Sequence, residues 1–156
     1  MALIAQPDAA YAALQHWMAR WSEWETHLAA LLLSPPAGDD WLVRLDRPLG
    51  QAQAMLATDE DATLYGLFQL ATASTVGYSS AHAMACWAMC RLLAPLAEVP
   101  AVDQGALERA ALTMNIGMTR LQDTLAEQET PPTEEQRALI DTHPARGAQS
   151  LAVLLV

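Results

Sequence analysis

The stretch YAALQHWMARWSEWETHLAALL, residues 11–32, carries apolar side chains at intervals of three and four residues. Spacing of this kind places them along one face of an α-helix. Arg20, Glu23 and Glu25 occupy polar positions between the apolar ones. The stretch therefore predicts a long amphipathic helix that extends from Asp8 to Leu33.

A proline-rich segment follows this helix. Residues 34–38, Ser-Pro-Pro-Ala-Gly, are expected to end it, because proline cannot continue a helix and glycine supplies a turn. Asp39 and Asp40 are candidate caps for a second helix. Pro48 indicates a break or a late start in that helix, because proline lacks the N–H group that a helix interior needs.

The central part of the chain indicates three more helices. They are expected to begin at the acidic run after Asp59, near Tyr78, and at Asp103, and Gly117 ends or bends the last of them. The composition agrees, since 31 alanines and 24 leucines stand against only nine isoleucines and valines. We therefore predict an all-α bundle of about seven helices.

The C-terminal part indicates two further helices. Thr133 and Gln136 have the spacing of a capping box, and the short helix that they open is expected to reach about Thr142. Pro144 is then expected in the first turn of a last helix, which runs into the apolar residues 151–156. An exposed segment of that kind is a liability in a monomer, so we expect it to be buried in the bundle or in a homodimer.

Composition and charge narrow the possible functions. The 156 residues are 53% hydrophobic, which is enough material for one domain core. The basic residues are eight arginines, and the formal net charge is −10, which repels nucleic-acid phosphates and anionic lipids. We expect no membrane helix, no signal peptide and no disulfide framework. The sequence therefore predicts a cytoplasmic protein that binds neither nucleic acid nor membrane.

His82, Cys86 and Cys90 follow one another at intervals of four residues in a predicted helix. His and Cys are zinc ligands, but eight residues span about 12 Å of helix, so His82 and Cys90 cannot share one ion. The simpler interpretation is that both cysteines are small, buried core residues.

Four of the five tryptophans lie within the first 41 residues of the chain. Trp17, Trp21 and Trp24 share the apolar stripe of the first predicted helix, and Trp41 follows in the second. They either pack the N-terminal helix onto the bundle or form an exposed interaction face. His27, like His16, is interpreted as a surface or boundary residue of the first helix, without an assigned role.

Four segments resemble the HD-GYP branch of the HD metal-dependent phosphohydrolases. Residues 78–83 resemble the start of the family's helix that bears its first metal-ligand histidine, and residues 110–118 resemble its apolar stretch ending in His-Asp-Ile-Gly-Lys. Residues 121–135 resemble the loop that follows, and residues 140–148 the His-Pro-x-x-Gly helix start. The resemblance implies a degenerate HD-type domain over residues 61–156, apparently truncated at its C-terminus. It does not cover residues 1–60, which we predict to form an N-terminal helical arm packed on the bundle.

The departures from the family pattern concern its metal ligands. Met114 and Asn115 stand where the His-Asp pair would be, and Met118 replaces the lysine. A thioether is a poor ligand for hard or borderline divalent ions, and a neutral amide lacks the charge that holds two cations together. The resemblance therefore implies a relic pocket formed by His82, Met114, Asn115, Met118 and His143, without catalytic residues.

Two of the family's histidines are retained in this chain. His82 and His143 either hold one divalent ion (Fe, Mn or Zn) weakly, with Asp123 or a partner's residue as a further ligand, or serve only in packing and hydrogen bonding. The second interpretation is favoured because two neutral imidazoles make a weak site, so no cofactor is expected.

The resemblance and its departures together favour a non-catalytic function. We expect a bacterial signalling or interaction module that binds a protein partner or a second copy of itself. The alternative is an enzyme with a rearranged metal site that hydrolyses a phosphoester, cyclic di-GMP being the substrate that the resemblance implies. A third possibility is nucleotide sensing without hydrolysis, although the negative charge disfavours a dianionic ligand.

Overall fold

A computed structural model describes residues 9–35 and 40–154. Seven α-helices, one 3-10 helix and no strand occur in this part of the chain, so the prediction of an all-α fold of about seven helices is confirmed. The elements are α1 (Ala9–Leu33), α2 (Asp40–Thr58), α3 (Glu60–Ala73), α4 (Tyr78–Leu93), α5 (Ala101–Thr113), η1 (Ile116–Met118), α6 (Thr119–Glu127) and α7 (Glu134–Leu154). None of the helices in these described ranges combines the length and apolar character needed to cross a membrane.

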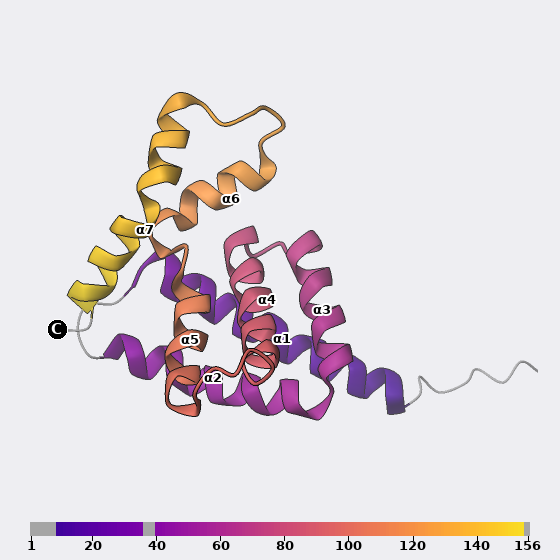
Figure 1. Ribbon diagram of the computed structural model, residues 1–156. Coiled ribbons are helices and arrows are strands. Elements are labelled where there is room, and N and C mark those ends of the chain that lie inside the picture. The colour runs from indigo at the N-terminus through magenta and orange to yellow at the C-terminus, as the bar shows by residue number, and fades with distance from the viewer. Residues whose placement is uncertain (1–8, 36–39, 155–156) are drawn as a thin grey trace, which may run out of the picture.

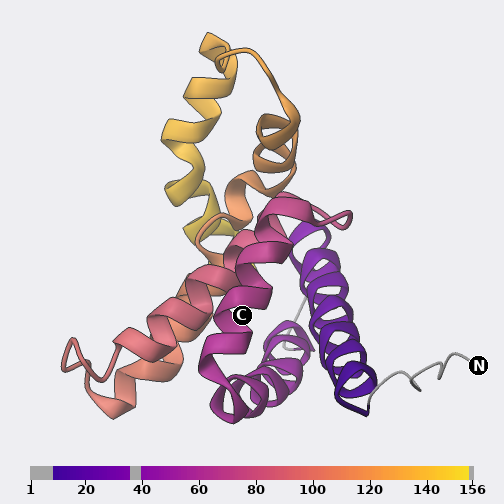
Figure 2. The same cartoon turned by 90° about the vertical axis from the view of Figure 1, so that its right-hand side faces the viewer.

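Helices α1 to α5 form the body of the molecule, and α6 and α7 form a hairpin that stands away from it (Figures 1 and 2). Helix α4 is central to the body, since it packs against α1, α3 and α5 and also contacts α6. The main contact of α7 is with η1, the short connection between α5 and α6. The position of α7 therefore depends mainly on η1, whereas α6 is also held by α4.

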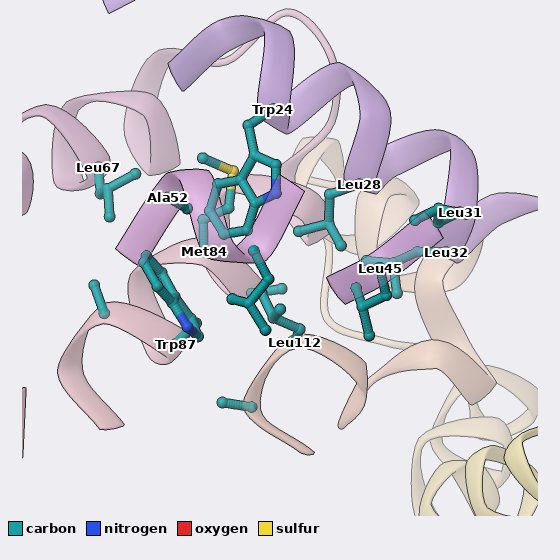
Figure 3. Packing of buried hydrophobic residues seen from close by; sticks show 14 of the residues in the cluster. Trp24, Leu28, Leu31, Leu32, Leu45, Ala52, Leu67, Met84, Trp87 and Leu112 are labelled. Carbon is teal, nitrogen blue, oxygen red and sulfur yellow. The ribbon is translucent and has the colours of Figure 1, made fainter. Parts of the chain in front are cut away.

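Indole rings join α1 to α4 in the core. Trp24 and Trp87 pack edge to face with ring centroids 5.0 Å apart, and Trp21 packs against Trp24 at 5.7 Å. Figure 3 shows Trp24 and Trp87 among the aliphatic side chains of the core. Trp21, Trp24 and Trp41 are buried and Trp17 is half-buried, so these tryptophans pack the N-terminal helix onto the bundle.

One cluster of buried residues spans both halves of the chain. It contains Leu45 and Leu56 from α2 together with Met84 from α4 and Leu112 from α5. The arm expected over residues 1–60 thus contributes to the same apolar cluster as the helices after it. The boundary at residue 60 stays a prediction.

The break expected at Pro48 is wrong. Helix α2 continues through this proline, which cannot donate a hydrogen bond to the carbonyl of Arg44 four residues earlier. The side chain of His27, in α1, takes over that role: its Nε2 lies 3.0 Å from the Arg44 oxygen. Because a carbonyl only accepts, this imidazole nitrogen must carry the proton. His27, to which the sequence assigned no role, thus satisfies the acceptor that Pro48 leaves open.

The helix boundary expected between Thr142 and Pro144 is also wrong. Helix α7 is continuous from Glu134 to Leu154, with Pro144 inside it, and Figure 1 shows it changing direction part-way along. The carbonyl that Pro144 leaves without its helical donor is that of Ile140, and it accepts a hydrogen bond from Nδ1 of His143. In both proline-containing helices, therefore, a histidine side chain satisfies the orphan carbonyl.

The predicted capping box is found, and a further cap occurs at Asp59. Of the two candidate caps of the second helix, Asp39 lies outside the described residues and Asp40 is the first residue of α2. Asp59 accepts a hydrogen bond from the Ala62 N–H at 2.9 Å and caps α3. Thr133 and Gln136 form the predicted capping box, since each side chain accepts from the other residue's N–H, at 3.2 and 2.8 Å.

The apolar C-terminal segment is buried only in part. Leu154 is buried against the core and Leu151 is half-buried, whereas Val153 is 71% exposed. Residues 155 and 156 lie outside the described residues. Within the described part of the segment, the expected burial is thus found at Leu154 and in part at Leu151, and not at Ala152 or Val153.

Candidate functional site

His82 lies on α4 between two chemically different neighbours. Its half-buried ring stacks on Tyr78 with centroids 5.4 Å apart and an interplanar angle of 12°. Its Nε2 is 3.6 Å from Sγ of Cys86, one turn further along the same helix. The contacts of the ring thus involve its own helix.

The two cysteines are free thiols and are half-buried rather than fully buried. Burial, and then the neighbouring Cys90, raise the pKa of the Cys86 thiol above its ordinary value. The thiolate is the nucleophilic form of cysteine, and a raised pKa disfavours it. The raised pKa therefore disfavours Cys86 as a nucleophile beside His82.

The segment that resembles the family's His-Asp-Ile-Gly motif packs closely against α7. A Cβ atom placed on Gly117 would lie 2.5 Å from the His143 carbonyl oxygen and 2.7 Å from the Gly147 nitrogen. A Cβ on Gly147 would lie 3.4 Å from the Ile116 side chain and 4.0 Å from the Met114 oxygen. The structure thus brings Gly117 next to the backbone of His143, whereas a common pocket of His82, Met114, Asn115, Met118 and His143 stays a prediction.

His143 has one ring nitrogen left for other interactions. Nδ1 donates to the Ile140 carbonyl, so in the neutral ring Nε2 carries the lone pair. The side chain is half-buried, and Met114 nearby is 40% exposed. Nε2 is therefore the atom through which this imidazole would ligate an ion.

Asp123, a candidate third ligand, has a structural partner. Its Oδ1 accepts a hydrogen bond of 2.7 Å from the backbone N–H of Ser79, in the first turn of α4. The hydroxyl of Ser79 in turn donates to the Thr119 carbonyl at 2.9 Å. Gly77, at the N-cap position of α4, has no side chain to do this, so Asp123 of α6 caps the helix from a distance.

The donors for a metal centre are not assembled. Among residues 9–35 and 40–154, no group of three or more His, Cys, Asp or Glu side chains is placed to hold a metal ion. Protein metal sites with catalytic roles use three or more protein ligands. The residues present therefore do not fit the divalent ion that the resemblance implies, and a weak site at His82 and His143 stays a prediction.

Met118, at the family's lysine position, lines a groove at the base of the hairpin. The groove has a volume of about 380 Å³ and lies between the end of α1, η1, α6 and α7. Leu33, Leu121 and Leu139 give it an apolar lining, and Arg120 and Arg146 add positive charge. Its lining holds no carboxylate, histidine or cysteine, and its polar side chains besides the arginines are the hydroxyls of Thr119 and Ser150.

Sequence reasoning missed a buried carboxylate network centred on Glu108 of α5. This side chain is 3% exposed and accepts hydrogen bonds from Trp87 Nε1 at 2.7 Å, Gln53 Nε2 at 2.8 Å and Arg91 Nη1 at 2.6 Å. The donors come from α2 and α4, so the network ties three helices together. In the sequence, the only indication of this network was that Glu108 places a charge beside the apolar face of its helix.

Glu25 is a second buried acid, on α1. It is 1% exposed, and its Oε1 accepts hydrogen bonds from the hydroxyls of Ser74, at 2.5 Å, and Ser80, at 3.5 Å. Burial raises the pKa of Glu25 above its ordinary value of 4.5, and the two hydrogen bonds lower it by less. The carboxyl thus keeps its proton to a higher pH in the folded protein than in the unfolded chain.

Replacing Glu25 by glutamine is expected to remove part of the pH dependence of stability. A group whose pKa is raised by folding binds more protons in the folded state, so its penalty is absent below pH 4.5 and grows as pH rises through the folded-state pKa. Urea unfolding of both proteins at pH 4, 5.5 and 7 should show Glu25→Gln gaining stability relative to the unaltered protein as pH rises. A constant difference across this range would contradict the assignment.

Comparison of the chain with protein-family models, with curated proteins and with solved structures found no match.

Proposed function

We propose that this chain is a non-catalytic signalling or protein-interaction module derived from an HD-type phosphohydrolase. We place it in the cytoplasm of a bacterium. In such a module, helical surfaces bind a partner protein or a second copy of the chain, and the ancestral metal site has lost its function. The proposal rests on the sequence resemblance together with the way in which the segment 114–118 is used in the fold.

The observation that carries the proposal is the packing of this segment against α7. In an HD-type enzyme, the His-Asp pair of this segment presents its side chains to metal ions. Here the same segment seats the hairpin, since Gly117 meets the backbone of His143 and Gly147. With methionine and asparagine in place of the ligands, the segment retains a packing function without metal chemistry.

The hairpin seated in this way offers surface for a protein partner. Helices α6 and α7 stand away from the body (Figure 2), and the groove at their base has an apolar lining with two arginines. Leu139 of the groove is 41% exposed, and Val153 further along α7 is 71% exposed. Exposed apolar side chains beside arginine are typical of protein interfaces.

A test is to restore the missing ligands with Met114→His and Asn115→Asp together. If the chain derives from an HD-type enzyme, the new donors join His143 and His82, and affinity for Zn²⁺ or Mn²⁺ measured by isothermal titration should rise at least tenfold. Unchanged affinity would mean that these positions do not converge, and the derivation would fail.

A matched control and an activity assay complete this test. Leu96→His with Ala97→Asp introduces the same two donors in adjacent, exposed positions between α4 and α5, and it should leave metal affinity unchanged. The unaltered protein should not hydrolyse bis(p-nitrophenyl) phosphate with added Mn²⁺ or Fe²⁺. Turnover above the buffer rate would favour the alternative of a phosphoesterase with a rearranged site.

A further inference from the structure

Three of the eight arginines line one cavity between α1 and α2, and none of the residues of the relic pocket belongs to this cavity. Arg20 comes from α1, and Arg44 and Arg47 come from α2. The cavity has a volume of about 410 Å³, within the range of pockets that hold small molecules. All three side chains are exposed, so their guanidinium groups are open to solvent.

The positive charge of this cavity is not balanced by ion pairs in the structure. The two ion pairs within residues 9–35 and 40–154 involve Arg91 and Arg109, and neither belongs to the cavity. One carboxylate, that of Glu23, also lines it, so three arginines face a single acid. In a chain with a formal net charge of −10, this is a local concentration of cations.

The floor of the cavity is apolar. Trp24 and Met55, both buried, line it together with Ala52 and Pro48. The walls are also held in place, because His27 of α1 donates to the Arg44 carbonyl of α2 directly beside the cavity. Walls fixed before binding reduce the ordering that a ligand must impose.

We propose that this cavity binds a small organic anion, with an aromatic or aliphatic body on the Trp24 and Met55 floor and an oxyanion held by the arginines. Guanidinium groups bind both carboxylates and phosphates, often through two parallel hydrogen bonds. A ligand of this class matches both the charge and the apolar lining, whereas a simple inorganic ion would leave the floor without a partner. The site is independent of the proposed interaction function.

The experiment compares probes that share a body or a charge. Isothermal titration with 1-naphthoate and 1-naphthyl phosphate should show one site, and the neutral 1-naphthalenemethanol and inorganic phosphate should each bind at least tenfold more weakly. The naphthyl anion that binds with the higher affinity identifies whether the cavity prefers a carboxylate or a phosphate group. Equal binding of the neutral probe, binding of inorganic phosphate as tight as that of the naphthyl anions, or no binding of either anion would overturn the proposal.

Variants locate the site. The double variant Arg44→Gln with Arg47→Gln should weaken binding of the tighter anion at least tenfold, and Arg137→Gln on α7 removes one positive charge elsewhere and should not. Because Arg44 and Arg47 are exposed, thermal melts of the variants should match that of the unaltered protein. Equal affinity of the double variant and the unaltered protein would place the anion elsewhere and refute the assignment.

Discussion

Replacing Glu108 by alanine is expected to lower the free energy of unfolding by about 3–5 kcal/mol. The change leaves three donors without their acceptor: the indole N–H of Trp87, the amide of Gln53 and the guanidinium of Arg91. Trp87 is fully buried, so its N–H cannot turn to water. Urea unfolding followed by tryptophan fluorescence measures the loss.

The exposed ion pair between Arg109 and Asp46 supplies a control. It is bidentate, with both N···O distances 2.8 Å, but the two side chains are 43% and 39% exposed. Asp46→Ala removes a carboxylate from a solvated pair and should cost about 1 kcal/mol or less. Similar losses for Glu108→Ala and Asp46→Ala would mean that burial of the Glu108 network has no energetic consequence.

Glu108→Gln separates charge from shape in the same network. The amide keeps one carbonyl oxygen as an acceptor. Its NH₂ group, however, must face an N–H group that donated a hydrogen bond to the carboxylate. We expect a loss between those of the alanine variant and the Asp46 control. Arg91 is 35% exposed as a side chain and can turn partly toward water, which limits the loss.

The helices were predictable because local spacing determines them. The apolar stripe of α1, the acidic start of α3 and the capping box at Thr133 depend on residues within a few positions of each other. The helix breaks predicted at Pro48 and before Pro144 are wrong because a side chain, which the apolar spacing does not reveal, replaces the missing backbone donor. The acceptor that each proline leaves open is satisfied by a histidine side chain, and for Pro48 that histidine comes from another helix.

Long-range partners also limited the prediction of the candidate site. In the sequence, nothing distinguishes Glu108 from other charged residues, because its partners Gln53 and Trp87 are 55 and 21 residues away along the chain. The capping role of Asp123 was missed for the same reason, because the helix end that it caps lies 44 residues earlier. The approach of residues 114–118 to His143 was expected from the resemblance, whereas the use of Gly117 as the contact was not.

Gly117→Ala is expected to displace α7 from η1 and the body. The new Cβ would lie 2.5 Å from the His143 carbonyl oxygen and 2.7 Å from the Gly147 nitrogen. Both are backbone atoms inside a helix, so the clash cannot be relieved by a side-chain rotation, and either η1 or α7 must move. Overpacking of this kind costs about 1–3 kcal/mol, and more where backbone must shift.

Because α7 meets the rest of the chain chiefly through η1, the damage should be local. Hydrogen exchange measured by mass spectrometry should accelerate across α7, residues 134–154, in Gly117→Ala and change little in α1 to α4 and in α6, which Asp123 and Thr119 tie to α4. Gly147→Ala is the matched control across the same contact: its Cβ would meet the Ile116 side chain at 3.4 Å, an ordinary contact, and alanine favours the helix by about 1 kcal/mol over glycine. If Gly117→Ala exchanged no faster than Gly147→Ala, the close approach of η1 to α7 would not hold α7, and the packing role proposed for this segment would be wrong.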